Sequence, residues 1–197
     1  MNIRIGIMAM LLVLPLSASA GDSSSSNAGS GSDIELSDLV ARFAKRTGKQ
    51  FIIDPRMRAQ VPLAGMDPDR ITYEKLLAIL NVHNFAAVSQ GDWIVIVPDA
   101  NARQLPTPVF TDRNFKALPD DLVTLVTKVK NACAAQMVPV LRPMMPQSAH
   151  MAVSPDTNTM ILNDHAANVH RIVTMIEAIE RNSPEGQGCE PVESNRK

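Results

Sequence analysis

Several residue types are scarce in this sequence, and each scarcity excludes a class of protein. Aromatic residues make up 4% of the 197 residues, so a buried core must be built mainly from aliphatic side chains. The formal net charge is -1 and no stretch concentrates Lys and Arg, whereas proteins that bind nucleic acids use clustered cations to neutralise phosphates. The composition therefore argues against nucleic acid as a partner. Hydrophobic residues at 45% and charged residues at 20% are typical of a globular chain.

Long hydrophobic runs are scarce too, and the main one lies near the N-terminus. The run Ile5–Leu16 follows Arg4 and precedes the small residues 18–20. A positive residue, a short apolar run and small residues together indicate a cleavable secretory signal peptide. The run is too short for a bilayer, which takes roughly 20 apolar residues. We therefore predict cleavage between Ala20 and Gly21, export of the chain, and no membrane span in the mature protein; an uncleaved anchor is the alternative.

Cysteine is limited to Cys133 and Cys189. In an exported protein an even pair of cysteines indicates a disulfide. A bridge between them would close a loop of about 57 residues, worth roughly 4 kcal/mol in the chain-entropy model. Two free thiols are the alternative. A catalytic thiol is poorly supported, because no setting that lowers a thiol pKa is identifiable in the sequence.

The stretch Thr47–Pro55 marks a helix that turns directly into a strand. Gly48 suits the residue just past a helix end, because glycine takes positive φ at little cost. Apolar residues at helical spacing precede it, with Asp33 as the expected cap. The strand Gln50–Asp54 should stop at Pro55, which has no N–H for a ladder. Beyond it the sequence predicts a strand around 61–66, a helix of residues 73–82 capped by Thr72, and a hairpin of strands 86–89 and 93–97.

The second half predicts the order β-α-β-β-α. A strand within 122–130 is followed by a helix of residues 132–141, with Asn131 as its expected cap. Strands 150–153 and 159–163 then precede a helix of residues 165–181, with Asp164 as its expected cap.

The sequence thus predicts an α+β fold of two small domains, each with two helices on a small mixed sheet, the second arranged like a KH domain. Each domain is small enough that apolar burial alone gives marginal stability. The predicted boundaries are a signal peptide at 1–20, a flexible Ser/Gly linker at 21–32, a first domain at 33–98, a linker at 99–119, a second domain at 120–182 and a polar tail at 183–197.

These motifs resemble a known family. The runs 47–49 and 52–56, the leucine-rich helix and the Gly-Asp hairpin resemble the first periplasmic domain of secretins, which also occurs at the N-terminus of some TonB-dependent receptors. The run Leu141-Arg142-Pro143, then Asn158, Ile161-Leu162 and Asp164, resemble the next secretin domain. The resemblance is greatest to the start of a type II secretion outer-membrane secretin, with the type IV pilus and type III secretins as competitors.

The resemblance implies a non-enzymatic component of a secretion apparatus, located in the periplasm and associated with an outer-membrane complex. In that family the first domain contacts an inner-membrane component and the second packs against neighbouring secretin subunits, so homo-oligomers are expected. Secretins continue into a pore-forming domain, whereas this sequence stops at Lys197. We therefore expect either a stand-alone accessory or a truncated secretin. A periplasmic peptide-binding signalling or scaffold module is the alternative function.

The sequence predicts no catalytic residue, cofactor or metal site. His165 and His170 lie five residues apart and do not share a helical face, so surface or cap roles explain the histidines best. Asp54 and Asp67 each stand beside a proline, which indicates turns rather than a carboxylate pair. The GXXG clamp of KH-type RNA binders is absent. An enzyme is therefore the least favoured class.

The candidate partner surface is a strand and the turn after it. Edge strands offer unpaired N–H and C=O groups to another chain, and strand addition uses them. Arg56 and Arg58 flank the turn and would favour an acidic or carbonyl-rich partner, with solvated loop charge as the alternative. The predicted surface comprises Gln50, Phe51, Ile52, Ile53, Asp54, Arg56 and Arg58.

Overall fold

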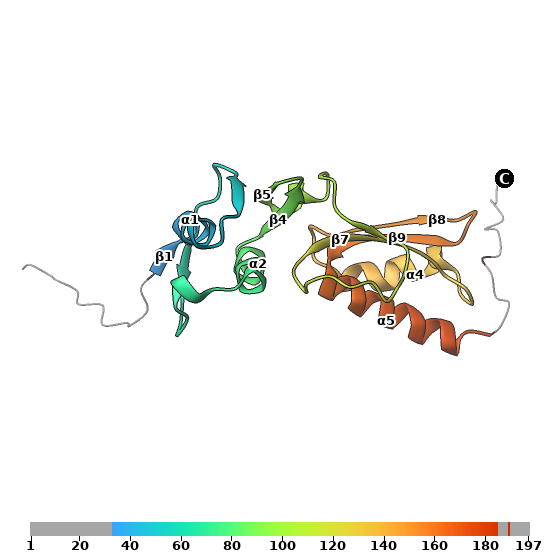
Figure 1. Ribbon diagram of the computed structural model, residues 1–197. Helices are drawn as coiled ribbons and strands as arrows, with labels where there is room; N and C mark the ends of the chain where they lie inside the picture. The colour runs from blue at the N-terminus through green and yellow to red at the C-terminus, as the bar shows by residue number, and fades with distance from the viewer. Residues whose placement is uncertain (1–32, 185–188, 190–197) are drawn as a thin grey trace, which may run out of the picture. The chain divides into compact units, whose positions relative to one another are not determined.

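The computed structural model describes residues 33–184 and Cys189, so the predicted signal peptide and Ser/Gly linker lie outside the described residues. Two hydrophobic cores divide this part of the chain into a first lobe, residues 33–98, and a second lobe, residues 107–182. Figure 1 shows their elements. The first lobe contains β1 (Asp33–Glu35), α1 (Leu36–Thr47), β2 (Gln50–Ile53), β3 (Gln60–Pro62), the 3-10 turn η1 (Pro68–Arg70), α2 (Tyr73–Val82), β4 (Phe85–Gln90) and β5 (Trp93–Pro98).

Helix α1 ends as the sequence predicts. Gly48 has φ 71° and donates its N–H to the Ala44 carbonyl at 2.9 Å. At the start of α2, the Thr72 hydroxyl accepts from the Lys75 N–H, as expected for a cap. Both helices bury aliphatic stripes against one face of a sheet, and the core they share includes Leu36, Leu39, Val40, Phe43, Leu76, Leu77, Leu80, Ile94 and Ile96.

Two sheets make up the strands of the first lobe. The three-stranded sheet has the order β2-β5-β4, with β2 parallel and β4 antiparallel to β5. The second sheet pairs β1 with β3 antiparallel. Strand β1 was not predicted, and it corrects the expectation that Asp33 caps α1, because Asp33 pairs with Pro62 and Glu35 precedes the helix. The predicted strand around 61–66 is shorter and ends at Pro62.

Residues 99–119, predicted as a linker, connect the lobes and include two short regular elements. They contain α3 (Asp99–Ala102) and β6 (Val109–Phe110). Strand β6 pairs parallel with β7 (Leu122–Lys128) and so belongs to the second lobe's sheet. A small cluster of Ala86, Val88, Ala102 and Leu122 adds buried residues from β4, α3 and β7. Two residues of pairing are too short to leave a periodic signal in a proline-rich sequence.

The second lobe is a four-stranded sheet with the order β6-β7-β9-β8. Strands β8 (His150–Ser154) and β9 (Thr159–His165) form the predicted hairpin, and α4 (Ala134–Leu141) and α5 (Ala166–Asn182) lie on one side of the sheet (Figure 1). A 3-10 turn, η2 (Arg142–Met144), follows α4. The predicted α+β class, with two helices on a mixed sheet in each lobe, is confirmed.

Two predicted caps of the second lobe are wrong. Helix α4 begins at Ala134 rather than Ala132, and its first N–H is accepted by Asn158 Oδ1 at 2.9 Å instead of by Asn131. Asn158 has φ 51° and also donates to the carbonyls of Val129 and Ala132, each at 2.8 Å. Strand β9 runs through Asp164 to His165, so Asp164 is a buried residue of the strand rather than the cap of α5.

The structure contains a disulfide between Cys133 and Cys189, separated by 56 residues in sequence. Cys133 immediately precedes α4, so the bridge fixes Cys189 beside the start of that helix. Within residues 33–184, no helix is both long enough and apolar enough to cross a bilayer.

Candidate partner-binding surface

Strand β2 is an edge strand, as the sequence prediction required. Among the described residues it pairs with β5 alone, in parallel register from Gln50 opposite Trp93 to Ile53 opposite Ile96. Asp54 donates its N–H to the Ile96 carbonyl at 2.9 Å. Because backbone groups alternate in direction along a strand, the N–H and C=O groups of Phe51 and Ile53 face away from β5. These two residues present the open edge.

Side chains of β2 alternate between the core and the outer face of the sheet. Phe51 and Ile53 pack against the core of the first lobe, while Ile52 points outward with 51% of its surface exposed. Trp93 stands opposite Gln50 on β5 and is 49% exposed. The outer face beside the open edge therefore presents an exposed Ile and an exposed Trp, a combination suited to burial against another protein.

The turn after β2 is closed by an internal ion pair. Arg56 donates to both carboxylate oxygens of Asp54, at 2.9 Å from Nε to Oδ1 and 2.7 Å from Nη2 to Oδ2. The Arg56 backbone N–H also donates to Asp54 Oδ1. These hydrogen bonds lower the pKa of Asp54 to about 2. Asp54 thus already accepts guanidinium N–H groups of Arg56, but the Arg56 side chain is 64% exposed, so its contact with an acidic partner stays a prediction.

Arg58 lies apart from the β2 ladder. It precedes β3 and lines a shallow hollow of about 330 Å³ together with Glu35, Ala59 and Gln60. The Ala59 carbonyl accepts from the Leu36 N–H at 2.9 Å, which ties this loop to the start of α1. The predicted surface is thus two adjoining features: the open edge with its turn, and a hollow beside the β1–β3 pair.

Of the surface or cap roles predicted for the histidines, His165 takes the cap position, because it immediately precedes α5 and is buried. His165 is 3% exposed, its Nδ1 lies 2.9 Å from the Asp120 carbonyl, and its Nε2 lies 3.3 Å from Asp99 Oδ1. Burial alone would lower the pKa of His165, but the contacts with the Asp99 carboxylate and the Asp120 carbonyl outweigh it and raise that pKa. Asp164 lies in the same cluster and burial raises its pKa. Burial would raise the pKa of Asp99, the partner of His165, but hydrogen bonds with His165 and Ser148 outweigh burial and lower that pKa.

Sequence reasoning missed Trp93 as a surface residue. The signal was present, because Trp93 and Val95 fall on the opposite face of β5 from the buried Ile94 and Ile96. It missed Arg113 as well, since the partners of that side chain lie 14 and 67 residues further along the chain. The predicted cysteine pair is joined in the structure, whereas the cleavage site at Ala20 and Gly21 lies outside the described residues.

Comparison with protein families supports two consecutive domains. Residues 31–96 match the GspD-like N0 domain, and residues 124–185 match the bacterial type II/III secretion system short domain. The fold and these matches define a pair of secretin N-terminal domains. More particularly, these matches support an N-terminal secretin fragment of type II secretion, with the N0 domain and the following short domain in that order.

Individual relatives agree with this assignment. The chain is 29% identical over 151 residues to secretin XcpQ of Pseudomonas aeruginosa, covering 76% of this chain and 22% of XcpQ. It is 28% identical over 152 residues to secretin GspD of Vibrio cholerae, covering 75% and 22% respectively. The chain therefore spans under a quarter of the length of these curated relatives.

A solved structure shows the same fold. The type II secretion outer-membrane complex of Klebsiella pneumoniae, which contains PulD, PulS and the PulC HR domain, aligns with a TM-score of 0.67 at 22% identity. The alignment covers 77% of this chain and 26% of that chain.

Proposed function

We propose that this chain is a non-enzymatic periplasmic component of a type II protein secretion apparatus, and that the first lobe binds an inner-membrane component through the β2 edge. The observation that carries the proposal is the open edge at Phe51 and Ile53, bordered by exposed Ile52 and Trp93. The similarity of residues 31–96 to the GspD-like N0 domain supports it. The Klebsiella complex, which holds PulC together with PulD, indicates the class of partner.

Strand addition explains how so small a surface can be selective. The partner's main chain would hydrogen-bond to the outward N–H and C=O groups of Phe51 and Ile53, and its alternate side chains would cover Ile52. The Asp54–Arg56 pair closes the turn, and Pro55 ends the ladder, so pairing is confined to the length of β2. Because the edge is short, a single domain should bind weakly. Repetition of the domain in an oligomer would strengthen the binding.

The test is a titration of the chain with the periplasmic part of the candidate inner-membrane partner. On binding, the amide protons of Phe51 and Ile53 should become protected from exchange, while that of Ile52, which faces β5, should change little. Ile52→Lys should weaken binding about tenfold, because it removes roughly half of an Ile side chain's burial energy. The matched control is Val82→Lys, whose side chain on α2 is 77% exposed and should leave binding unchanged.

Two outcomes would oppose the proposal at different levels. Saturable binding that Ile52→Lys does not weaken, with Phe51 and Ile53 unprotected, would move the site elsewhere on the lobe. An absence of binding to every component of the apparatus, together with normal secretion after deletion of the gene, would reject the function itself. The alternative, a peptide-binding signalling or scaffold module, predicts binding of an extended peptide without any secretion defect.

A further inference from the structure

The sheet of the second lobe has two long edges, and one is covered by a segment that is mostly not a strand. Strand β7 forms seven residue pairs with β9 on one side, but only two with β6 on the other. Its sequence is rich in Val, Leu and Thr, the composition of a strand that pairs readily with another chain. The segment that covers the outer edge of β7 therefore decides whether this strand can pair with another chain.

Residues 107–115 follow that outer edge along its length. The Thr107 and Thr124 hydroxyls lie 2.9 Å apart, and Thr124 donates its N–H to the Pro108 carbonyl at 2.9 Å. The β6 ladder comes next, after which the Asp112 carboxylate accepts from the Asn114 N–H and turns the chain away. Main-chain cover therefore stops before the end of β7.

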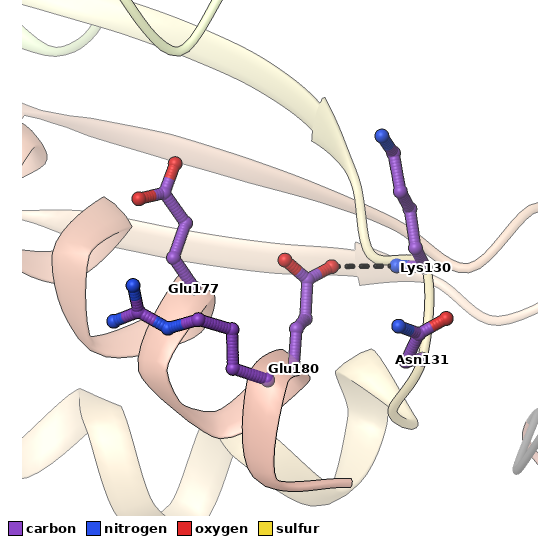
Figure 2. Close-up of a pocket in the computed structure, with 5 residues that line it drawn as sticks. Lys130, Asn131, Glu177 and Glu180 are labelled. Atoms are coloured by element: carbon purple, nitrogen blue, oxygen red, sulfur yellow. Dashed lines mark hydrogen bonds between the residues drawn. The ribbon is translucent and has the colours of Figure 1, made fainter. Parts of the chain in front are cut away.

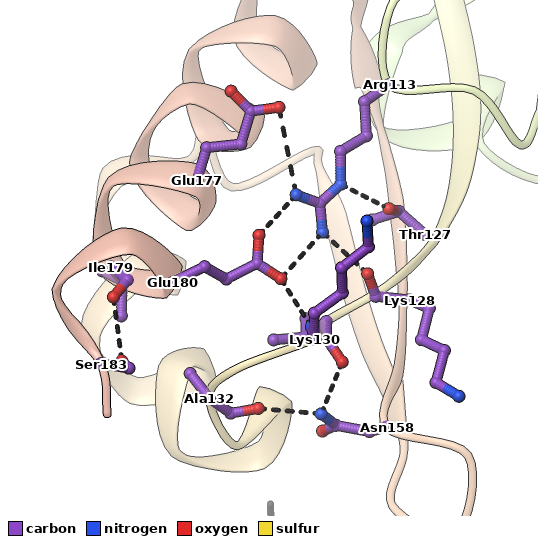
Figure 3. A network of polar contacts seen from close by, with 11 residues as sticks. Arg113, Thr127, Lys128, Lys130, Ala132, Asn158, Glu177, Ile179, Glu180 and Ser183 are labelled. Atoms are coloured by element: carbon purple, nitrogen blue, oxygen red, sulfur yellow. Dashed lines mark hydrogen bonds and ion pairs between the residues drawn. The ribbon is translucent and has the colours of Figure 1, made fainter. Parts of the chain in front are cut away.

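Arg113 completes the cover with its side chain. Figure 3 shows its guanidinium between the end of β7 and the last turns of α5. Nη2 donates to the Lys128 carbonyl at 2.8 Å and Nε donates to the Thr127 hydroxyl at 2.8 Å. The planar guanidinium thus bonds to the last β7 carbonyl, which lies beyond the reach of β6.

The guanidinium is held in place from the other side by Glu180. Arg113 Nη1 donates to Glu180 Oε2 at 2.6 Å, and Nη2 donates to Oε1 at 3.2 Å. Glu180 is 8% exposed, and its Oε1 also accepts from the Lys130 N–H at 2.6 Å (Figures 2 and 3). The exposed side of this region is a hollow of about 290 Å³ lined by Glu177, Arg181 and three further residues. Phe115 anchors the end of the segment, stacked on His170 with ring centroids 4.1 Å apart.

We propose that residues 107–115 are a strap that closes the outer edge of β7 against pairing with a second chain, and that Arg113 is the positioning residue of this strap. The strap prevents a second chain from pairing with the edge of β7, and it does so with one side chain where a third strand residue would normally stand. It is independent of the β2 edge and of the proposed function.

Arg113→Lys tests the proposal without leaving Glu180 unpaired, because Lys keeps the charge but cannot bond to Glu180, Thr127 and Lys128 together. Backbone alternation directs the amides of Val126 and Lys128 to the strap and those of Leu125 and Thr127 to β9. In the exported, disulfide-bonded chain, exchange at Val126 and Lys128 should accelerate about tenfold or more while Leu125 and Thr127 stay within about twofold. Light scattering should also show association that increases with concentration.

Two further variants keep the test decisive. Arg113→Met/Glu180→Met replaces the buried pair by apolar side chains of similar size, which usually preserves a fold, and should open the same two amides. Arg181→Ala, at the same hollow but exposed, should change nothing. Unchanged exchange at Val126 and Lys128 in both Arg113 variants would overturn the proposal. Equal acceleration of all four β7 amides in Arg113→Lys would also overturn it, because the pair would then stabilise the whole lobe rather than the edge.

Discussion

Removing the Cys133–Cys189 bridge should destabilise the second lobe specifically. The cysteines are separated by 56 residues, and the chain-entropy model gives about 4 kcal/mol for a loop of this length. A core of this size rarely supplies more than about 3–5 kcal/mol. The variant Cys133→Ser/Cys189→Ser should therefore leave the second lobe with no more than the roughly 3–5 kcal/mol that its core supplies. With urea slopes of about 1–3 kcal/mol/M, the midpoint should fall by about 1–4 M.

The chain's composition makes the assay specific to each lobe. Trp93 and Tyr73 are the chain's single Trp and single Tyr, and both lie in the first lobe. Their fluorescence should report an unchanged transition, while far-UV circular dichroism shows the second lobe unfolding earlier. Reduction of the native protein should reproduce the serine variant. The reasoning is refuted if the dichroism midpoint stays in place, or if the Trp93 transition moves by the same amount.

Three further outcomes are expected. N-terminal sequencing of the exported protein should begin at Gly21, and an intact Met1 in the soluble fraction would contradict export by cleavage. Burial opposes ionisation of Glu180, but hydrogen bonds from Arg113 and Lys130 outweigh burial and lower the pKa of Glu180 below 4.5. The ionised Glu180 therefore stabilises the fold above pH 4.5, and this stabilisation is lost as the pH falls through the pKa of the folded state. Urea midpoints should therefore fall less on acidification in Glu180→Gln than in the native chain. The pKa of His165 is raised above 6.5. The protonated His165 therefore stabilises the fold below pH 6.5, and this stabilisation is lost as the pH rises through the pKa of the folded state. In His165→Gln, the urea midpoint should fall less as the pH rises.

Local signals in the sequence predicted most of the fold. Helix α1 and its end at Gly48 follow from apolar spacing and from a residue that tolerates φ 71°. The cap at Thr72 and the β4–β5 hairpin likewise depend on neighbours within a few residues. These are the features for which short-range chemistry decides the conformation.

Several errors concern partners far apart in sequence. Ala134 obtains its cap from Asn158, 24 residues away, so the nearby Asn131 was the wrong inference. The ion pair of Arg56 with Asp54 shows a second limit, because the two residues adjoin the same proline and the turn geometry decides whether the charge is free or paired. The open edge at β2 was predicted and the exposure of Trp93 could have been, but the position of Trp93 beside that edge follows only from the parallel register with β5.

That parallel register also determines when the β2 edge comes into existence. Gln50 pairs with Trp93 across the whole of α2 and β4, so β2 has no strand partner until the last strand of the lobe has been made. Long-range parallel pairing of this kind forms slowly, because the intervening chain must be closed before the ladder is gained. An unfolded chain therefore has no β2 edge to which the proposed partner could bind, and we expect that a peptide copied from residues 50–58 does not reproduce this edge. The proposed binding at the β2 edge therefore requires a folded first lobe.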